Sequence, residues 1–177
     1  LEQRKSALYS LQSVLRDASD LDRYVEQLDR QAQQQGLDKP IVRKALGLVL
    51  FDKQQYEEAA VQLRQAALGQ PNDAETHKSL IDCYDRLGDQ QGVVRQSLEL
   101  LKLKPREMDV YRRLARRFTD LQQPDQVERT YTSMVEVLPG ESEGQAMLAE
   151  IRQEQGKWGE AAEHWRQVAR IRSLEPT

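Results

Sequence analysis

The sequence is poor in the residues and segments that mark several common classes of protein. It has one cysteine, Cys83, so it cannot form an internal disulfide, which excludes the disulfide-rich scaffolds of small secreted proteins. Aromatic residues make up only 6% of the 177 residues and the mean hydropathy is −0.78, so there is little bulk to fill one central core. The longest nearly unbroken apolar run, Ala45–Phe51, is far shorter than the roughly 20 residues that a membrane-spanning helix needs. We therefore expect no direct membrane insertion and a location in the cytoplasm or the periplasm.

The charge balance also lacks a dominant sign. Lys and Arg number 26 against 29 Asp and Glu, which leaves a formal net charge of −3. A charge this small creates no global field that would attract nucleic acid or an anionic membrane, so any such site has to be local. Abundant glutamine and an excess of Arg over Lys favour a bacterial source by composition alone.

What the sequence does contain is a period of 34 residues. Three sets of apolar residues and prolines recur at this spacing: Leu46, Leu80, Leu114 and Leu148; Pro71, Pro105 and Pro139; Ala59, Val93, Val127 and Ala161. Self-similarity at a fixed period indicates a fold built from one repeated supersecondary unit. Within each repeat the apolar residues recur at helical spacing, and the prolines end the second helix, so each repeat is predicted to be a helical hairpin.

The hairpins are predicted at 40–73, 74–107, 108–141 and 142–175, each with a first helix of about 13 residues. Gly88-Asp89 and Gln155-Gly156 mark turns between helices, and Pro124 stands where a second helix begins, a position that tolerates its missing N–H. Residues 5–38 carry a weaker version of the same pattern and are predicted to be a diverged hairpin. The whole sequence, 1–177, is therefore interpreted as one all-α repeat domain.

These hairpins resemble tetratricopeptide repeats (TPRs), and the resemblance covers 40–175 strongly and 5–38 weakly. The family pattern of Leu-Gly, a small residue, a bulky residue and a closing Pro is matched at Leu46-Gly47, Ala59, Leu63 and Pro71. Later repeats match it with these residues: Tyr111, Leu114, Ala115, Phe118, Val127, Tyr131 and Pro139; Leu148, Ala149, Gly156, Trp158, Ala161 and Trp165. The resemblance implies a right-handed superhelical solenoid of about five hairpins.

Several positions depart from the family pattern. Arg152 replaces an aromatic, Arg117 stands where a small residue is usual, and Ser97 replaces a bulky residue of a second helix. Arginine can lay its aliphatic stem on apolar surface, so we expect looser hairpins and not another architecture. Because repeat arrays need a polar cap, the last repeat is predicted to continue into a longer protein or to be capped by a partner.

The resemblance implies that first helices line a concave binding surface, reached by the fifth and ninth residues of each repeat. The fifth residues are Lys44, Lys78, Arg112 and Ala146, and the ninth are Leu48, Asp82, Arg116 and Glu150. Six of these are the candidate partner-binding residues: Lys44, Leu48, Lys78, Asp82, Arg112 and Arg116. Three cations 34 residues apart are expected to line one wall of the groove, with Arg116 one helical turn from Arg112.

Two interpretations of this cationic row remain open. In one, the cations bind carboxylates of an acidic peptide or of a protein's C-terminus through charge-assisted hydrogen bonds. In the other, they are solvated helix residues neutralised by nearby acids such as Asp109 and Asp120. The TPR carboxylate clamp for chaperone C-termini needs an Asn one turn after the first Lys. Leu48 stands there instead, which disfavours that partner.

Chemistry beyond binding is not indicated by any motif. The run Arg112–Arg117 is basic, but no wider basic face or set of stacking aromatics accompanies it, so we expect no nucleic-acid partner. His77 is expected to be packed, His164 to be an exposed helix residue, and Cys83 to be a small core residue. No metal-ligand spacing or phosphate-binding loop is present, so we expect no cofactor, no metal and no catalytic residue.

The sequence therefore predicts a non-enzymatic scaffold that binds a peptide segment, acidic in one interpretation, in a concave TPR groove. The alternative is a structural spacer or assembly arm that contacts partners through its terminal helices. Exposure of Trp165, Val168 and Ile171, and self-association through the C-terminal helix, would favour that alternative. Fold alone does not decide between them.

Overall fold

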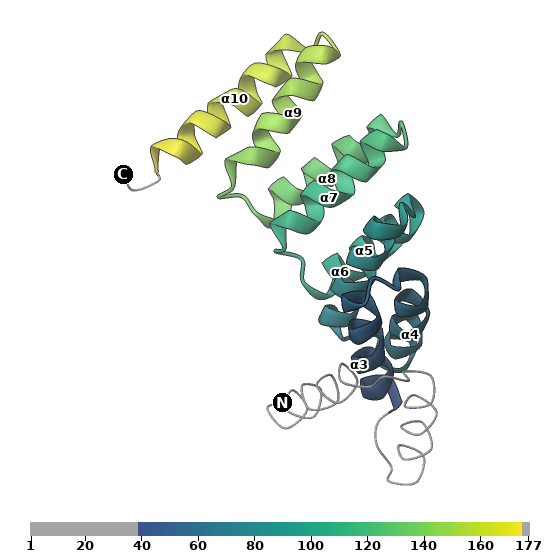
Figure 1. The fold of residues 1–177 in the computed structure, drawn as a ribbon. Helices are drawn as coiled ribbons and strands as arrows, with labels where there is room; N and C mark the ends of the chain where they lie inside the picture. Colours follow the sequence, from purple (N-terminus) through teal and green to yellow (C-terminus); the bar gives the residue numbers. More distant parts are fainter. Residues whose placement is uncertain (1–38, 175–177) are drawn as a thin grey trace. The chain divides into compact units, whose positions relative to one another are not determined.

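The computed structural model describes residues 39–174, which fold into consecutive α-helices joined by short turns (Figure 1). The predicted diverged hairpin at 5–38 lies outside these residues. The helices are α3 (Lys39–Asp52), α4 (Tyr56–Gly69), α5 (Ala74–Leu87), α6 (Gln90–Leu103), α7 (Met108–Asp120), α8 (Pro124–Val137), α9 (Ser142–Glu154) and α10 (Trp158–Ser173). Successive pairs form four antiparallel hairpins, α3/α4, α5/α6, α7/α8 and α9/α10.

The turns follow from the residues predicted to make them. Gly88 and Gly156, which follow α5 and the C-cap of α9, have φ angles of 70° and 73°, a left-handed conformation that glycine adopts at little cost. Pro124 is the first residue of α8, as expected from its fixed φ and missing N–H. The prolines at 71, 105 and 139 each lie two residues beyond the end of a second helix.

The described residues divide into two compact units, 39–103 and 104–174, which we call the N-terminal and C-terminal units. In the N-terminal unit α4 packs against both α3 and α5, and α6 packs against α5. Leu63 of α4 is fully buried, and its Cγ lies 2.6 Å from where a Cβ on Gly47 would be. Only glycine therefore allows α3 and α4 this approach, which explains the Leu46-Gly47 signature.

In the C-terminal unit α8 packs against α7 and α9, and α10 packs against α9. Met134 of α8 is fully buried, and Tyr131 and Leu148 are at most 8% exposed. A Cβ on Gly144 of α9 would lie 2.9 Å from Cγ2 of Val135, so this glycine permits close packing of α9 on α8. The core of each unit thus lies between neighbouring hairpins, as a repeat architecture requires.

A polar contact closes three of the four hairpins at equivalent positions. Arg43 Nη1 donates to Gln62 Oε1 over 2.7 Å, and a residue 34 further on, His77, has Nδ1 2.8 Å from Oε1 of Gln96. In the last hairpin Nδ1 of His164 lies 2.7 Å from Oε1 of Gln145. Each pair spans 19 residues, and we call these contacts the hairpin bridges. His164 is therefore half-buried and hydrogen-bonded, so the expectation of an exposed helix residue was wrong.

The arginine that replaces an aromatic residue in the last repeat is held by an ionic network. Nη2 of Arg152 lies 2.6 Å from Oε1 of Glu128 on α8, and its Nε lies 2.7 Å from Oε2 of Glu160 on α10. The Nε contact lacks the alignment of a hydrogen bond and is an ion pair only. Gln155 adds a 3.2 Å hydrogen bond to the other oxygen of Glu128. This side chain, 16% exposed, joins three helices where the other repeats have an apolar residue.

Candidate partner-binding face

The first helices of the N-terminal unit carry four of the six candidate residues. Lys44 and Leu48 lie on α3, Lys78 and Asp82 lie on α5, and the two helices contact each other. Lys78 is exposed, whereas Leu48 and Asp82 are half-buried. Lys44 is only 14% exposed, because its Nζ lies 2.7 Å from a carboxylate oxygen of Asp73.

Asp73, which was not among the candidates, organises the start of α5. It is the N-cap of that helix and accepts hydrogen bonds from the backbone N–H of Glu75 and the hydroxyl of Thr76. Burial raises the pKa of Asp73, but the hydrogen bonds from Lys44 and Thr76 outweigh this and hold the pKa below its usual value. Lys44 is therefore engaged in joining α3 to the N-terminus of α5, a place where negative charge is favoured.

Arg112 of the C-terminal unit is engaged in a similar way. Its Nε lies 2.8 Å from both carboxylate oxygens of Glu143, in the first turn of α9, and its Nη1 lies 2.8 Å from Asp109. The hydrogen bonds from Glu143 raise the pKa of the Arg112 guanidinium above its ordinary value. Arg112 thus joins α7 to α9 as Lys44 joins α3 to α5.

The remaining two cations differ from this pair. Lys78 and Arg116 are exposed, and neither side chain has an ion-pair or hydrogen-bond partner in the part of the protein that the structure describes. Arg116 lies one turn beyond Arg112 on α7, in the same unit. The cations therefore separate into structural ones, Lys44 and Arg112, and free ones, Lys78 and Arg116. That all of them line one groove stays a prediction.

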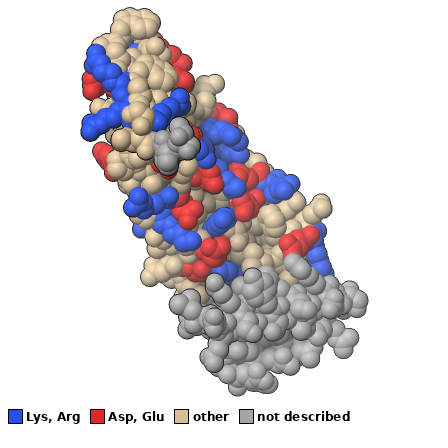
Figure 2. Space-filling model, turned by 90° about the vertical axis from the view of Figure 1, so that its left-hand side faces the viewer, with Lys and Arg blue, Asp and Glu red and all other residues tan. Residues whose placement is uncertain are grey.

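Figure 2 shows basic and acidic side chains intermingled on the face that it displays. Within the run from 112 to 117, Leu114 and Ala115 are buried and Arg117 pairs with Asp120 at 2.9 Å. Only part of the run therefore faces solvent as free positive charge. Exposed pairs of this kind contribute little stability.

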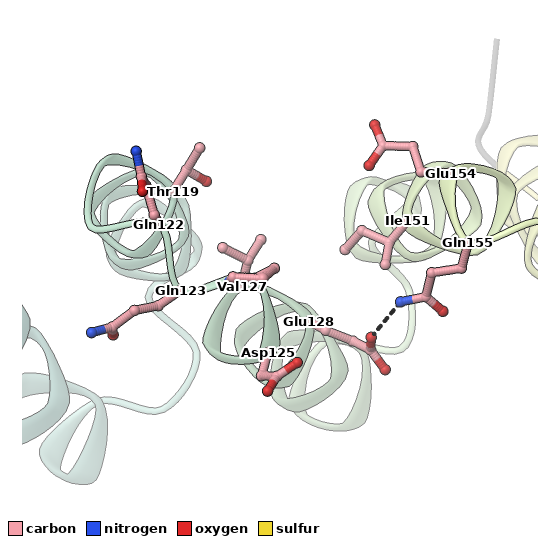
Figure 3. Close-up of a pocket in the computed structure, with 10 residues that line it drawn as sticks. Thr119, Gln122, Gln123, Asp125, Val127, Glu128, Ile151, Glu154 and Gln155 are labelled. Carbon is pink, nitrogen blue, oxygen red and sulfur yellow. Dashed lines mark hydrogen bonds between the residues drawn. The ribbon is translucent and has the colours of Figure 1, made fainter.

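A hollow lies over α8 in the C-terminal unit, between the end of α7 and the end of α9 (Figure 3). Its volume is about 380 Å³, and Val127 and Ile151 supply its apolar surface. Val127 is half-buried, whereas Ala59, Val93 and Ala161 at the same repeat position are at most 2% exposed. Polar groups form most of the remaining lining: Thr119, Gln122, Gln123, Asp125, Glu128, Glu154 and Gln155. The opening is at the lower end of the size of ligand pockets.

Groups that could carry chemistry are buried or isolated. Cys83 is fully buried, and burial raises its thiol pKa to about 12, so the prediction of a core residue is confirmed. His77 is also buried, with Nε2 2.9 Å from the carbonyl oxygen of Pro71. Among residues 39–174 no three His, Cys, Asp or Glu side chains group to hold a metal ion. Over the same range no helix has both the length and the apolar character to cross a bilayer.

The three apolar residues of α10 whose exposure would favour an assembly arm are at least partly covered. Val168 is buried at 4% exposure, and Trp165 and Ile171 are half-buried. Among residues 39–174, the large ring with the greatest exposure is that of Trp158, at 67%. The equivalent residue of the preceding repeat is Pro124, so the repeat pattern gave no indication that an aromatic ring would be exposed here.

The described helices, arranged as hairpins whose equivalent residues pack alike, define an all-α helical-repeat protein of the solenoid type. The protein is similar to solved structures of MamA, a TPR-like all-helical protein. A crystal structure of MamA protein matches with a TM-score of 0.61 and 13% identity, over 100% of this sequence and 98% of that one. MamA from AMB-1 matches with a TM-score of 0.61, 15% identity and coverage of 100% and 96%. MamA from Desulfovibrio magneticus RS-1, residue 41 to the end, matches with a TM-score of 0.57, 14% identity and coverage of 98% of both proteins.

Structural matches at identities this low give information on the fold alone. They confirm the predicted all-α repeat class. No protein-family model and no curated protein matches the sequence. Function therefore has to be argued from the described side chains.

Proposed function

We propose that the protein is a non-enzymatic protein-interaction scaffold whose hairpins are TPRs and whose first helices bind an acidic peptide segment. Helical-repeat folds present extended surfaces of first helices, and this is the surface on which the candidate residues lie. The similarity to MamA supports a scaffold of this fold type. The burial and the high pKa of the Cys83 thiol accord with a binding role in place of nucleophilic chemistry.

The observation that carries the proposal is the free state of Lys78 and Arg116. Both are exposed on first helices, one in each unit, without an ion-pair partner among the described residues. A cation that already holds an acid has to give it up before it can bind a ligand carboxylate, and Lys78 and Arg116 do not. Charge-assisted hydrogen bonds to a carboxylate are about twice as strong as neutral ones.

The hollow over Val127 supports a second contact in the C-terminal unit. Its apolar surface suits one medium-sized apolar side group of a bound segment, since pockets combine apolar walls with a few polar groups. The carboxylates in its lining, such as Asp125 and Glu154, disfavour an acidic side chain there. Acidic residues of the segment would meet Arg116, and an apolar residue would enter the hollow. The bound segment is thus proposed to be acidic with apolar residues among the acids.

The test measures binding of fluorescein-labelled peptides by anisotropy. The probes are a Glu- and Leu-containing peptide with a free C-terminus, its Glu-to-Gln analogue, and a Lys-containing analogue. We expect the acidic peptide to bind, the other two not to bind, and added salt to weaken binding. The combined variant Lys78→Glu and Arg116→Glu should lose this binding while its helical circular dichroism stays unchanged.

The matched control is Lys102→Glu, because Lys102 is an exposed lysine on the second helix α6 and its loss changes the net charge in the same direction. It should bind the acidic peptide like the wild type. Equal binding of all three peptides, or full binding by the Lys78 and Arg116 variant, would contradict the proposal. Capture from a native lysate followed by mass spectrometry then identifies the natural partner.

A second candidate function is an assembly arm that contacts partners through its terminal helices. The observation that favours it is the exposure of Trp158, at 67%, on α10, the last helix that the structure describes. Large exposed rings next to other apolar residues mark interaction surfaces more often than single scattered ones. This candidate uses none of the first-helix cations, so the two functions can be tested apart.

A further inference from the structure

One side of α10 carries an apolar strip that no described helix covers. The strip consists of Trp158, Ala162, Trp165 and Ala169, which are spaced by four, three and four residues and therefore lie along one side of the helix. Trp158 and Ala169 are exposed, and Ala162 and Trp165 are half-buried. Figure 1 shows α10 beside α9. The neighbouring side of α10, with the buried residues Ala161 and Val168, packs against α9.

The same positions on earlier second helices contact the first helix of the following hairpin. Tyr56, equivalent to Trp158, has the guanidinium of Arg86 on α5 at 6.0 Å from its ring centre. Glu128, equivalent to Ala162, pairs with Arg152 on α9. These contacts lie within the N-terminal and C-terminal units respectively.

The fourth position of the strip behaves alike. Val135, equivalent to Ala169, packs against Gly144 on α9. Tyr131, equivalent to Trp165, is only 8% exposed beneath this packing. By repeat equivalence the α10 strip is a surface built to receive a helix.

The strip is complementary to itself when two copies of α10 run antiparallel. A two-fold axis between Glu163 and His164 places Trp158 opposite Ala169 of the other copy, because 158 and 169 are equally far from that point. The same axis places Ala162 opposite Trp165. Each large ring thus meets a small residue along the whole strip, which is the packing that interfaces between helices need.

One flank of the strip carries charged residues. Glu163 and Arg166 lie there, both are exposed, and they pair with each other within α10 at 2.6 Å. With the axis between 163 and 164, the two copies of Glu163 face each other next to the axis, and Arg166 of each copy also comes close to Glu163 of the other. The case for the pair therefore rests on the match of large rings with small residues and not on this flank.

We propose that α10 is a self-association site, in which the strips of two copies of this protein pair antiparallel to form a symmetric dimer. This inference rests on the second candidate function and names its partner. It does not involve Lys78 or Arg116, so it stands or falls independently of the acidic-peptide site. In the dimer, the rings of Trp158 and Trp165 would become buried and would supply most of the apolar surface removed from water.

The test is sedimentation velocity of the 177-residue protein over a series of concentrations. The wild type should pass from monomer to dimer as the concentration rises, and Trp158→Glu should remain a monomer. Leu174→Glu is the matched control, because Leu174 is 76% exposed next to the end of α10 and lies on the other side from the strip. It should dimerise like the wild type. Circular dichroism checks that each variant keeps its helices.

A size swap tests the register of the pair. Ala169→Trp alone sets two large rings against each other, and Trp158→Ala alone leaves a gap, so each single variant should dimerise more weakly. The double variant restores one large and one small residue at each crossing and should recover the dimer. A monomeric wild type, dimerisation of Trp158→Glu at the wild-type concentration, or failure of the double variant to recover overturns the proposal.

The acidic-peptide assay separates this failure from that of the proposed function. Trp158→Glu should bind the acidic peptide like the wild type, and the Lys78→Glu and Arg116→Glu variant should dimerise like the wild type. Loss of both properties in either variant would contradict the independence of the two sites.

Discussion

The two units are built from the same hairpins but are closed by different interactions. The N-terminal unit buries large apolar side chains completely, among them Leu63, Leu80, Ile81 and Val49. In the C-terminal unit only Met134 is among the largest side chains with less than 2% exposure within residues 39–174. Ionic contacts centred on Arg112 and Arg152 join its helices, whereas in the N-terminal unit the ion pair of Lys44 with Asp73 accompanies the dry packing. One backbone plan thus tolerates either dry packing or paired charges between neighbouring hairpins.

The two units also differ in whether a hollow borders the equivalent second-helix residues. Dry packing leaves Ala59 and Val93 inaccessible, and α3 contacts α5 directly. In the C-terminal unit Val127 borders a hollow of about 380 Å³. The hollow is lined by Glu128 and Gln155, which also belong to the polar network around Arg152. Binding capacity and looser packing therefore occur in the same unit.

The largest effect is expected from a variant that disrupts the apolar packing of the N-terminal unit. Leu63→Ala removes a fully buried side chain that packs on Gly47, and such truncations cost about 2 to 5 kcal/mol. Hydrogen exchange should show faster opening of α3 and α4 with little change in α9 and α10. Leu68→Ala on the same helix, where the leucine is 77% exposed, is the control and should cost under about 0.5 kcal/mol. Equal effects of the two would contradict the comparison.

The second effect tests the ionic closure. Arg152→Ala leaves Glu128 without its main partner and should destabilise the C-terminal unit by about 1 to 3 kcal/mol in urea denaturation. The double change Arg152→Tyr with Glu128→Ala copies the residues that the N-terminal unit has at these positions, Tyr84 and Ala60, and should restore most of the loss.

Arg129→Ala is the control for that pair of variants, because Arg129 is exposed on the same helix as Glu128 and has no partner among the described residues. It should leave the urea midpoint nearly unchanged. If Arg152→Tyr with Glu128→Ala is no more stable than Arg152→Ala, the two modes of closure are not interchangeable.

The third effect concerns the turns, which both units share. Gly156→Ala forces a side chain into a φ of 73° and should cost about 1 to 2 kcal/mol, although a Cβ there would touch nothing. Gly140→Ala, in a turn without a positive φ, is the control and should be neutral. Thermal denaturation compares the two. A neutral Gly156→Ala would show that the turn relaxes.

The smallest effect is a pH dependence of the C-terminal unit that comes from Glu128. The hydrogen bond from Arg152 is the main cause that lowers the pKa of Glu128 from 4.5 to about 2. The folded state thus binds this proton less readily than the unfolded state, so the stabilisation is complete above pH 4.5 and is lost as the pH falls toward 2. Solvent exposure of 29% reduces it to about 1 kcal/mol.

The measurement is the difference in unfolding free energy between the wild type and Glu128→Gln as a function of pH. The difference should shrink as the solution is acidified through that window. In an Arg152→Ala background only Gln155 and Lys157 still favour the ionised carboxylate, so the difference should be much smaller at every pH. A difference that persists at the acid end would mean that packing, not charge, distinguishes the wild type.

The fold could be predicted because the apolar residues that recur every 34 positions all have to be buried. Leu46, Leu80, Leu114 and Leu148 are each at most 4% exposed, so any polar replacement would leave an unpaired group in the core. Arg152 replaces the aromatic residue of the repeat pattern. The fold accommodates this arginine because Glu128, which lies 24 residues earlier on another helix, pairs with it. A pattern that compares only equivalent positions cannot find such a partner.

The candidate site could be predicted only in part. The positions of the cations on first helices followed from the period. Which of these cations already pair with an acid of the same protein did not. Lys44 and Arg112 hold Asp73 and Glu143, acids 29 and 31 residues further on, at the start of the next first helix. That spacing is short of one period by a few residues, so a search at 34 passes over it. The exposure of Trp158 depends on which helix covers α10, and periodicity does not supply that information.

The hairpin bridges have a consequence for how such a protein can change over generations. They recur at the same two positions but use Arg43, His77 and Gln145 on the first helix, with a glutamine or a histidine opposite. A recombination event in phase with the repeat would join a first helix of one hairpin to a second helix of another. Arg43 would then meet Gln96, or Gln145 would meet Gln62, and either pair can still form a hydrogen bond. The three hairpins that carry the bridge could therefore exchange helices in these two combinations without leaving the bridge unmade.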